Sequence, residues 1–266
     1  METVTSKDGT RIACEGLGSG PPLVLVDGAL CCRGFGPMAP LAKRLATRFT
    51  VVHYDRRGRG DSGDTPPYAV EREIEDLAAI VDGLGGSAFV YGTSSGAALA
   101  MRAVSRGVRA RKLALFEPPW AMDASASPLL PTYRARIDAL LAEGRRGDAV
   151  ALFMRVVGVP GFGVFMMKLM PNVWPKLKGV AHTLPYDFAQ LGDVPGQPLP
   201  RALVEELNAV KAPTLALLGG KSPDWMRRAV ETAASAIPGA KLVTIPGQNH
   251  AISAKAIAPV LAGFFT

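Results

Sequence analysis

The chain has 266 residues, of which 48% are hydrophobic and 20% are charged. These proportions exclude an intrinsically disordered chain and fit a single domain with a sizeable core, or one domain that carries an insertion. The net charge is +7, but the arginines are scattered along the chain and form no basic stripe. Nucleic acid is therefore not an expected partner.

Cysteine is rare, with residues only at positions 14, 31 and 32. An odd count with one adjacent pair is not a disulfide framework and indicates a reducing compartment. The first residues show no signal-peptide pattern, and no uncharged apolar run reaches membrane-spanning length. The sequence thus predicts a cytoplasmic protein without stable membrane insertion.

In the first half of the chain, short apolar runs alternate with amphipathic helical patterns. The runs predict strands at 23–26, 50–54, 88–91 and 112–116. The patterns between them predict helices at 38–48, 71–84 and 95–106. Such alternation is typical of parallel strands joined by crossover helices.

The alternation stops at Pro118, and helical fragments broken by many prolines follow. It resumes with predicted strands at 214–218 and 241–245 and helices at 226–237 and 252–265. We therefore expect an α/β fold, a mostly parallel doubly wound sheet with an inserted helical cap. The predicted core comprises 1–117 and 209–266, and the predicted cap comprises 118–208.

A GTSSG run at 92–96 lies between a predicted strand and a predicted helix. The pattern alone is common by chance, but a serine in this strand-turn-helix setting is typical of a hydrolase nucleophile. Small residues two positions away on both sides allow a sharp turn that exposes the central side chain. Ser94 is the predicted nucleophile, and the amide of Ser95, at the helix start, is a predicted oxyanion donor.

A serine nucleophile needs a histidine base, and the chain has three candidates, His53, His182 and His250. His53 lies inside an apolar strand and is expected to be a packed structural residue, while His182 lies in the proposed cap. His250 follows the last predicted strand, at the sheet edge where catalytic groups gather. We therefore predict His250 as the base.

These features, together with YDRRGRGDS at 54–62, resemble the α/β-hydrolase superfamily over nearly the whole chain. The run at 54–62 is similar to a turn in that family, and we interpret it as structural, with Asp55 and Arg57 bracing the turn. The resemblance implies a second oxyanion donor, the amide of Ala29. Asp27 stands where the family has histidine, and we expect its carboxylate to face away from a developing anion.

The resemblance also implies an acidic residue that orients His250, and two candidates remain. Asp224 follows the strand at 214–218 but falls one residue late for the family spacing, so it is equally suited to cap the next helix. Glu117 ends a buried strand, where an unpaired carboxylate is costly and a histidine partner is expected. We favour Glu117 over Asp224.

The stretch 151–169 is too apolar for a solvated surface helix. We expect it, with Trp120, Trp174 and Tyr186, to form an adaptable apolar pocket over Ser94; interfacial membrane contact is the alternative. The sequence thus predicts a serine hydrolase that cleaves a small to medium apolar ester or lactone through an acyl-enzyme, without metal or cofactor. The alternative is a non-hydrolytic member: a ligand sensor, a pathway cyclase or lyase, or a cofactor-free peroxidase.

Overall fold

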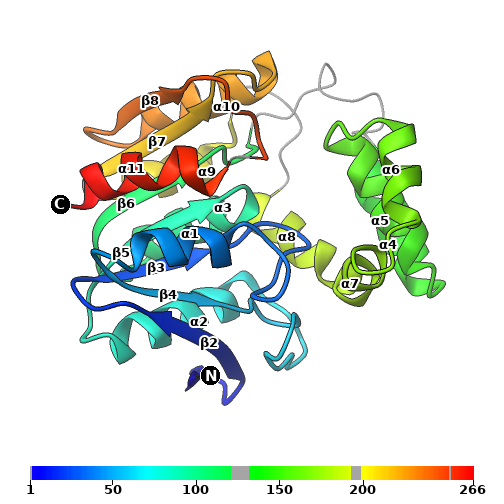
Figure 1. Ribbon diagram of the computed structural model, residues 1–266, viewed down its shortest axis with the longest axis horizontal. Helices are drawn as coiled ribbons and strands as arrows, with labels where there is room; N and C mark the ends of the chain where they lie inside the picture. The colour runs from blue at the N-terminus through cyan, green and yellow to red at the C-terminus, as the bar shows by residue number, and fades with distance from the viewer. Residues whose placement is uncertain (1, 121–131, 193–198, 252) are drawn as a thin grey trace.

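The computed structural model describes residues 2–120, 132–192, 199–251 and 253–266. Its centre is an eight-stranded sheet in the order β1-β2-β4-β3-β5-β6-β7-β8, with helices on both faces (Figure 1). β2 pairs antiparallel with both neighbours, and the other neighbouring pairs are parallel. The strands are β1 (Glu2–Thr5), β2 (Arg11–Leu17), β3 (Pro22–Val26), β4 (Thr50–Tyr54), β5 (Ala88–Thr93), β6 (Ala110–Phe116), β7 (Thr214–Gly219) and β8 (Lys241–Ile245). The predicted mostly parallel, doubly wound sheet is confirmed.

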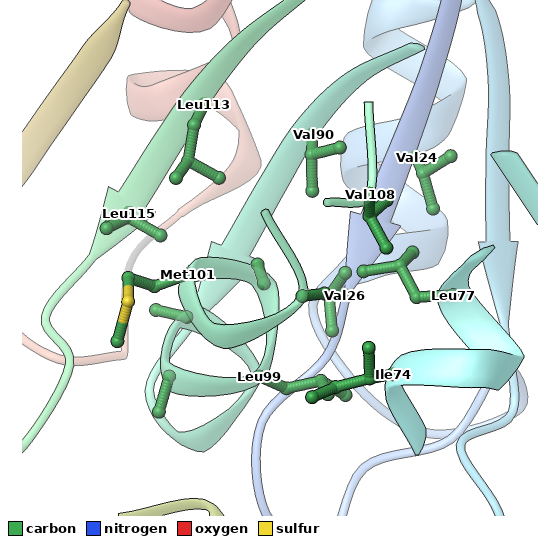
Figure 2. Close-up of a cluster of buried hydrophobic side chains, with 14 of the residues drawn as sticks. Val24, Val26, Ile74, Leu77, Val90, Leu99, Met101, Val108, Leu113 and Leu115 are labelled. Atoms are coloured by element: carbon green, nitrogen blue, oxygen red, sulfur yellow. The ribbon is translucent and has the colours of Figure 1, made fainter. Parts of the chain in front are cut away.

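Side chains of the central strands alternate between two cores because successive residues of a strand point to opposite faces. Val24 and Val26 pack toward one layer of helices, while Leu23 and Leu25 pack toward the other. Figure 2 shows the first of these cores, where Leu99 lies beside Ile74 and below Val26. The first layer contains α2 (Val70–Gly83), α3 (Ser95–Ser105), α9 (Arg201–Asn208) and α10 (Asp224–Ala236), and the second contains α1 (Met38–Leu45) and α11 (Ala254–Phe265).

The predicted helical insertion is confirmed: a group of helices lies between β6 and α9 and forms a lobe beside the sheet (Figure 1). It comprises α4 (Tyr133–Ala142), α5 (Arg146–Val156), α6 (Gly161–Lys168), α7 (Trp174–Gly179), the short 3-10 helix Ala181–Thr183 and α8 (Leu184–Leu191). These helices share their own buried core. The predicted cap also contained α9, but Leu203 and Leu207 of this helix are buried in the core beneath α3. The division of the chain at 118 and 208 stays a prediction.

The first two strands were not predicted, since neither has a regular apolar pattern. In β2 three consecutive residues, Ile12, Ala13 and Cys14, are buried, so the alternation expected of a strand with one solvated face is absent. None of the helices in the described ranges is long and apolar enough to cross a membrane.

Candidate active site

The carboxyl ends of β3 and β5 are neighbours in the middle of the sheet. After β3 the chain passes to β4 on one side, and it later enters β5 on the other side of β3. Open parallel sheets bind ligands in the crevice where the strand order reverses in this way. Ala29 follows β3 and Ser94 follows β5, so the fold brings two of the predicted site residues to that crevice.

Ser94 joins β5 to α3 in a strained backbone conformation. Its φ of 54° and ψ of −128° lie in a region that side-chain-bearing residues rarely adopt. A Cβ atom at Gly92 would collide with the carbonyl of Gly96, and one at Gly96 would collide with the carbonyl of Asp27. The N–H of Ser94 donates to the carbonyl of Phe116 at 2.9 Å. Close packing on both sides therefore fixes a turn whose apex is Ser94.

His250 and Glu117 are in direct contact. Nδ1 of His250 lies 2.7 Å from Oε2 of Glu117, and the glutamate side chain is fully buried. Its other oxygen, Oε1, accepts hydrogen bonds from the N–H of Gly219, at 2.7 Å, and from the hydroxyl of Ser222. Glu117 thus has a partner for each carboxylate oxygen, and Oε2 is directed at the imidazole.

The structure places Asp224 elsewhere. This residue is exposed at the start of α10, directly after Pro223. Of the two acids considered from the sequence, the one that contacts His250 is Glu117. Ser222 and Gly219, which follow β7, were not predicted to take part in the site, because serine and glycine in a loop carry no distinct sequence signal.

A cavity of about 80 Å³ brings Ser94 and His250 together with apolar side chains of the cap and core. Its lining residues are Ala29, Ser94, Ser95, Pro119, Tyr133, Phe153, Val156, Val157, Asp187, Phe188, Leu191, Pro223, Trp225, Met226 and His250. The aromatic residues expected from the sequence lie elsewhere: Trp120 is buried in the core beneath α3, Trp174 lies beside Lys168, and Tyr186 stacks on Tyr68. The cavity wall is nevertheless mostly apolar.

Ala29 and Ser95, the predicted oxyanion donors, both line this cavity. Ser95 is the first residue of α3, where backbone N–H groups have no acceptor within the helix and the helix dipole favours negative charge. Gly28 passes close to the nucleophile, since a Cβ atom there would lie 3.1 Å from Cβ of Ser94. The segment that carries Ala29 is thus packed against the turn that carries Ser94.

A buried cluster of ion pairs at the cavity wall links the core to the cap. Asp187 of α8 accepts hydrogen bonds from Arg56 at 2.8 Å, from Arg59 through both carboxylate oxygens at 2.8 Å, and from the hydroxyl of Ser95 at 2.7 Å. Arg56 also forms a two-point pair with Glu73 of α2 at 2.7 and 2.8 Å. Two guanidinium groups therefore face two carboxylates, and all four side chains are almost fully buried.

The same arginines hold the backbone beside the predicted oxyanion donors. Nη1 of Arg59 donates to the carbonyl of Gly28 at 2.6 Å, and Nη1 of Arg56 donates to the carbonyl of Asp27 at 3.3 Å and to the hydroxyl of Ser95 at 3.2 Å. The sequence interpretation of this turn as purely structural thus missed its contacts with the site. A signal was available in Asp187, a single acid in an otherwise apolar stretch of predicted helix.

The other charged residues of the turn brace it, as expected. Asp55 accepts a hydrogen bond from the N–H of Asp61 at 2.9 Å and pairs with Arg33 at 3.0 Å. Arg57 pairs with Asp76 and Asp8, each at 2.7 Å. These pairs lie away from the residues that line the cavity.

Asp27 is 3% exposed, and its carboxylate accepts the N–H of Gly28 at 2.9 Å. It is not among the described residues that line the cavity. Burial raises the pKa of this carboxyl from its ordinary 3.8 to about 7, against the opposing effects of the Gly28 hydrogen bond and of Arg59. The folded protein therefore binds this proton more tightly than the unfolded chain does.

Asp27→Asn is expected to stabilise the protein at alkaline pH. Because the pKa is higher in the folded state, the contribution of Asp27 to stability falls as pH rises from about 3.8 to about 7, and then levels off. A neutral amide removes this loss, so the variant should gain up to about 4 kcal/mol of unfolding free energy above pH 7 and little near pH 4. Urea denaturation at both pH values measures the difference. Asp82→Asn, at an exposed position, is the control, and an equal gain at both pH values would contradict the assignment.

With the geometry in place, comparisons with known proteins identify the chain's relatives. A family model described as "Alpha/beta hydrolase family" matches residues 29–261. An alpha/beta hydrolase from Sphaerobacter thermophilus DSM 20745 is 55% identical, with a TM-score of 0.90 and complete coverage of both chains. A thermophilic esterase from Thermogutta terrifontis is 25% identical, with a TM-score of 0.64 over 100% of this chain and 99% of that one. An enol-lactonase from Burkholderia xenovorans LB400, 22% identical with a TM-score of 0.62 over 99% of each chain, shares the fold. The chain belongs to the alpha/beta hydrolase family.

Proposed function

We propose that this protein is a serine hydrolase that cleaves a small to medium apolar ester or lactone through an acyl-enzyme. The proposal rests on one observation: Ser94, in its strained backbone conformation, and His250, which is paired with Glu117, line the same apolar cavity. A serine hydroxyl is a weak nucleophile until a neighbouring base accepts its proton. A carboxylate that fixes the imidazole gives that base its orientation and stabilises its charged form.

In the proposed reaction the hydroxyl oxygen of Ser94 attacks the carbonyl carbon while its proton passes to Nε2 of His250. Nδ1 keeps its proton and donates it in the hydrogen bond to Glu117. The amides of Ala29 and Ser95 stabilise the oxyanion of the tetrahedral intermediate. His250 then returns the proton to the leaving alkoxide. Water, activated by the same imidazole, releases the acid and restores Ser94.

The cavity wall supports an apolar substrate. Tyr133, Phe153, Phe188 and Trp225 contribute aromatic surface around the site. Among the described residues that line the cavity, the only carboxylate is that of Asp187, and it is already paired with two arginines, so it offers no unpaired charge to a ligand. The Thermogutta terrifontis esterase, which is 25% identical, is compatible with this substrate class.

A fluorophosphonate probe tests the proposal directly, because it phosphonylates only an activated serine. We expect stoichiometric labelling, with the adduct on the peptide that contains Ser94, and no labelling of Ser94→Ala. Ser235→Ala, at an exposed position on α10 outside the cavity lining, is the control and should still be labelled. Intact folded protein that takes up no probe at Ser94 would overturn the proposal and favour a non-hydrolytic role.

A further inference from the structure

The cap carries an apolar face that nothing in the described protein covers. Five side chains on and just after α6 follow the spacing i, i+3, i+4, i+7 and i+8, which places them on one side of the helix. They are Phe162 (74% exposed), Phe165 (55%), Met166 (44%), Leu169 (61%) and Met170 (47%). We call these residues the outer cap face. Soluble monomers seldom expose so many large apolar side chains together, so this face is expected to have a binding partner.

The charge around the outer cap face is mainly positive. Residues 149–186 contain no aspartate or glutamate, but they include Arg155, Lys168, Lys176 and Lys178, all of them exposed. Lys168 and Phe165 line one surface hollow together with Arg136, Arg145 and Arg155. Asp148 also lines this hollow, and its carboxylate is paired with Arg145 at 2.9 Å, so the cations are in excess. Apolar side chains bordered by an excess of cations match the surface of an anionic lipid bilayer, which offers acyl chains beneath negative headgroups.

We propose that the outer cap face docks reversibly on anionic lipid membranes. Phe162, Phe165 and Leu169 would insert at the boundary between headgroups and acyl chains, while the surrounding cations contact phosphates. A second copy of the chain fits less well: a symmetric contact would bring Arg155 and Lys168 of both copies together, while the nearby carboxylate of Asp148 is already paired with Arg145. The short α6 lies in the plane of the surface and does not span it.

The outer cap face is linked to the candidate active site through Val157. This residue follows α5, is 40% exposed, and also lines the cavity that contains Ser94. Docking would therefore bring the cavity close to esters dissolved in the lipid. That consequence rests on the proposed hydrolase function and narrows its substrates to esters or lactones that partition into membranes; the docking itself does not require hydrolysis.

Co-sedimentation with vesicles tests the docking. We compare phosphatidylcholine vesicles with vesicles that also contain phosphatidylglycerol, using the whole 266-residue chain. We expect binding only to the anionic vesicles, weakened by salt as screened charges require. The double variant Phe162→Ser/Phe165→Ser should lose at least about tenfold in affinity, because it removes most of the inserted apolar surface. Leu242→Ser/Val243→Ser, at the exposed edge strand β8, is the matched control and should bind as the parent does.

The outcomes separate docking from the hydrolase proposal. Fluorophosphonate labelling of Phe162→Ser/Phe165→Ser should match the parent, since neither residue lines the cavity. Equal binding to neutral and anionic vesicles, or no loss in the double variant, would overturn the docking. A parent protein that binds no vesicles and is dimeric, together with a monomeric double variant, would also overturn the docking. That result would identify a second copy of the chain as the partner. Failure of labelling at Ser94 with intact vesicle binding would instead overturn only the hydrolase proposal.

Discussion

Glu117→Gln is expected to lower kcat by a factor on the order of 10⁴, while the protein stays folded. The reason lies in the hydrogen bonds of the carboxylate. Oε1 accepts from two donors, the N–H of Gly219 and the hydroxyl of Ser222, so the amide oxygen of a glutamine must occupy that place. The amide NH₂ then faces Nδ1 of His250. The imidazole is forced to carry its proton on Nε2, and it can no longer accept the proton of Ser94.

Steady-state kinetics with a short-chain aryl ester measure this effect. Asp224→Asn removes the other carboxylate considered for this role and is the matched control, with activity close to that of the parent because Asp224 is exposed at the start of α10. Thermal unfolding of both variants separates lost catalysis from lost folding. A Glu117→Gln enzyme with nearly full activity, alongside an inactive Asp224→Asn enzyme, would assign the acid to Asp224.

The sequence was sufficient for the parts of this protein that depend on local pattern. The central strands are continuous apolar runs, and their helices carry one apolar side, so each could be predicted within a few residues. The turn at Ser94 could also be predicted, because a strand, small residues and a helix follow each other directly. β1 and β2 lack such a pattern, and pairing with the rest of the sheet stabilises them instead.

The contacts around the site were harder to predict, because they join distant parts of the chain. Arg56 and Asp187 are 131 residues apart, and no local pattern relates them. The residues that line the cavity could not be predicted either. The sequence suggested Trp120, Trp174 and Tyr186, whereas the structure places Trp225 in the lining. The stretch 151–169 was expected to be buried, but only its first part lines the cavity, and one face of α6 is exposed.

Asp187→Asn is the second change with a large expected effect, since it alters the ion pairs at the cavity wall. The substitution leaves two buried guanidinium groups facing one carboxylate, Glu73, and we expect it to lower the unfolding free energy by about 3–5 kcal/mol. Arg56 and Arg59 also hold the hydroxyl of Ser95 and the carbonyl of Gly28. When the arginines shift, the backbone that carries the proposed oxyanion donors shifts with them.

Such a displacement is expected to lower kcat about 10²-fold, because small misplacements of groups that stabilise the transition state are costly. KM should change little, since Asp187 is a positioning residue whose carboxylate is already paired. Asp76→Asn breaks a matched buried pair, with Arg57, that lies away from the cavity. It should cost similar stability and leave kcat unchanged at a temperature where both variants are folded. Equal losses of kcat in the two variants would mean that Asp187 stabilises the fold without positioning the site, whereas a loss confined to Asp187→Asn would link the cap to the geometry around Ser94.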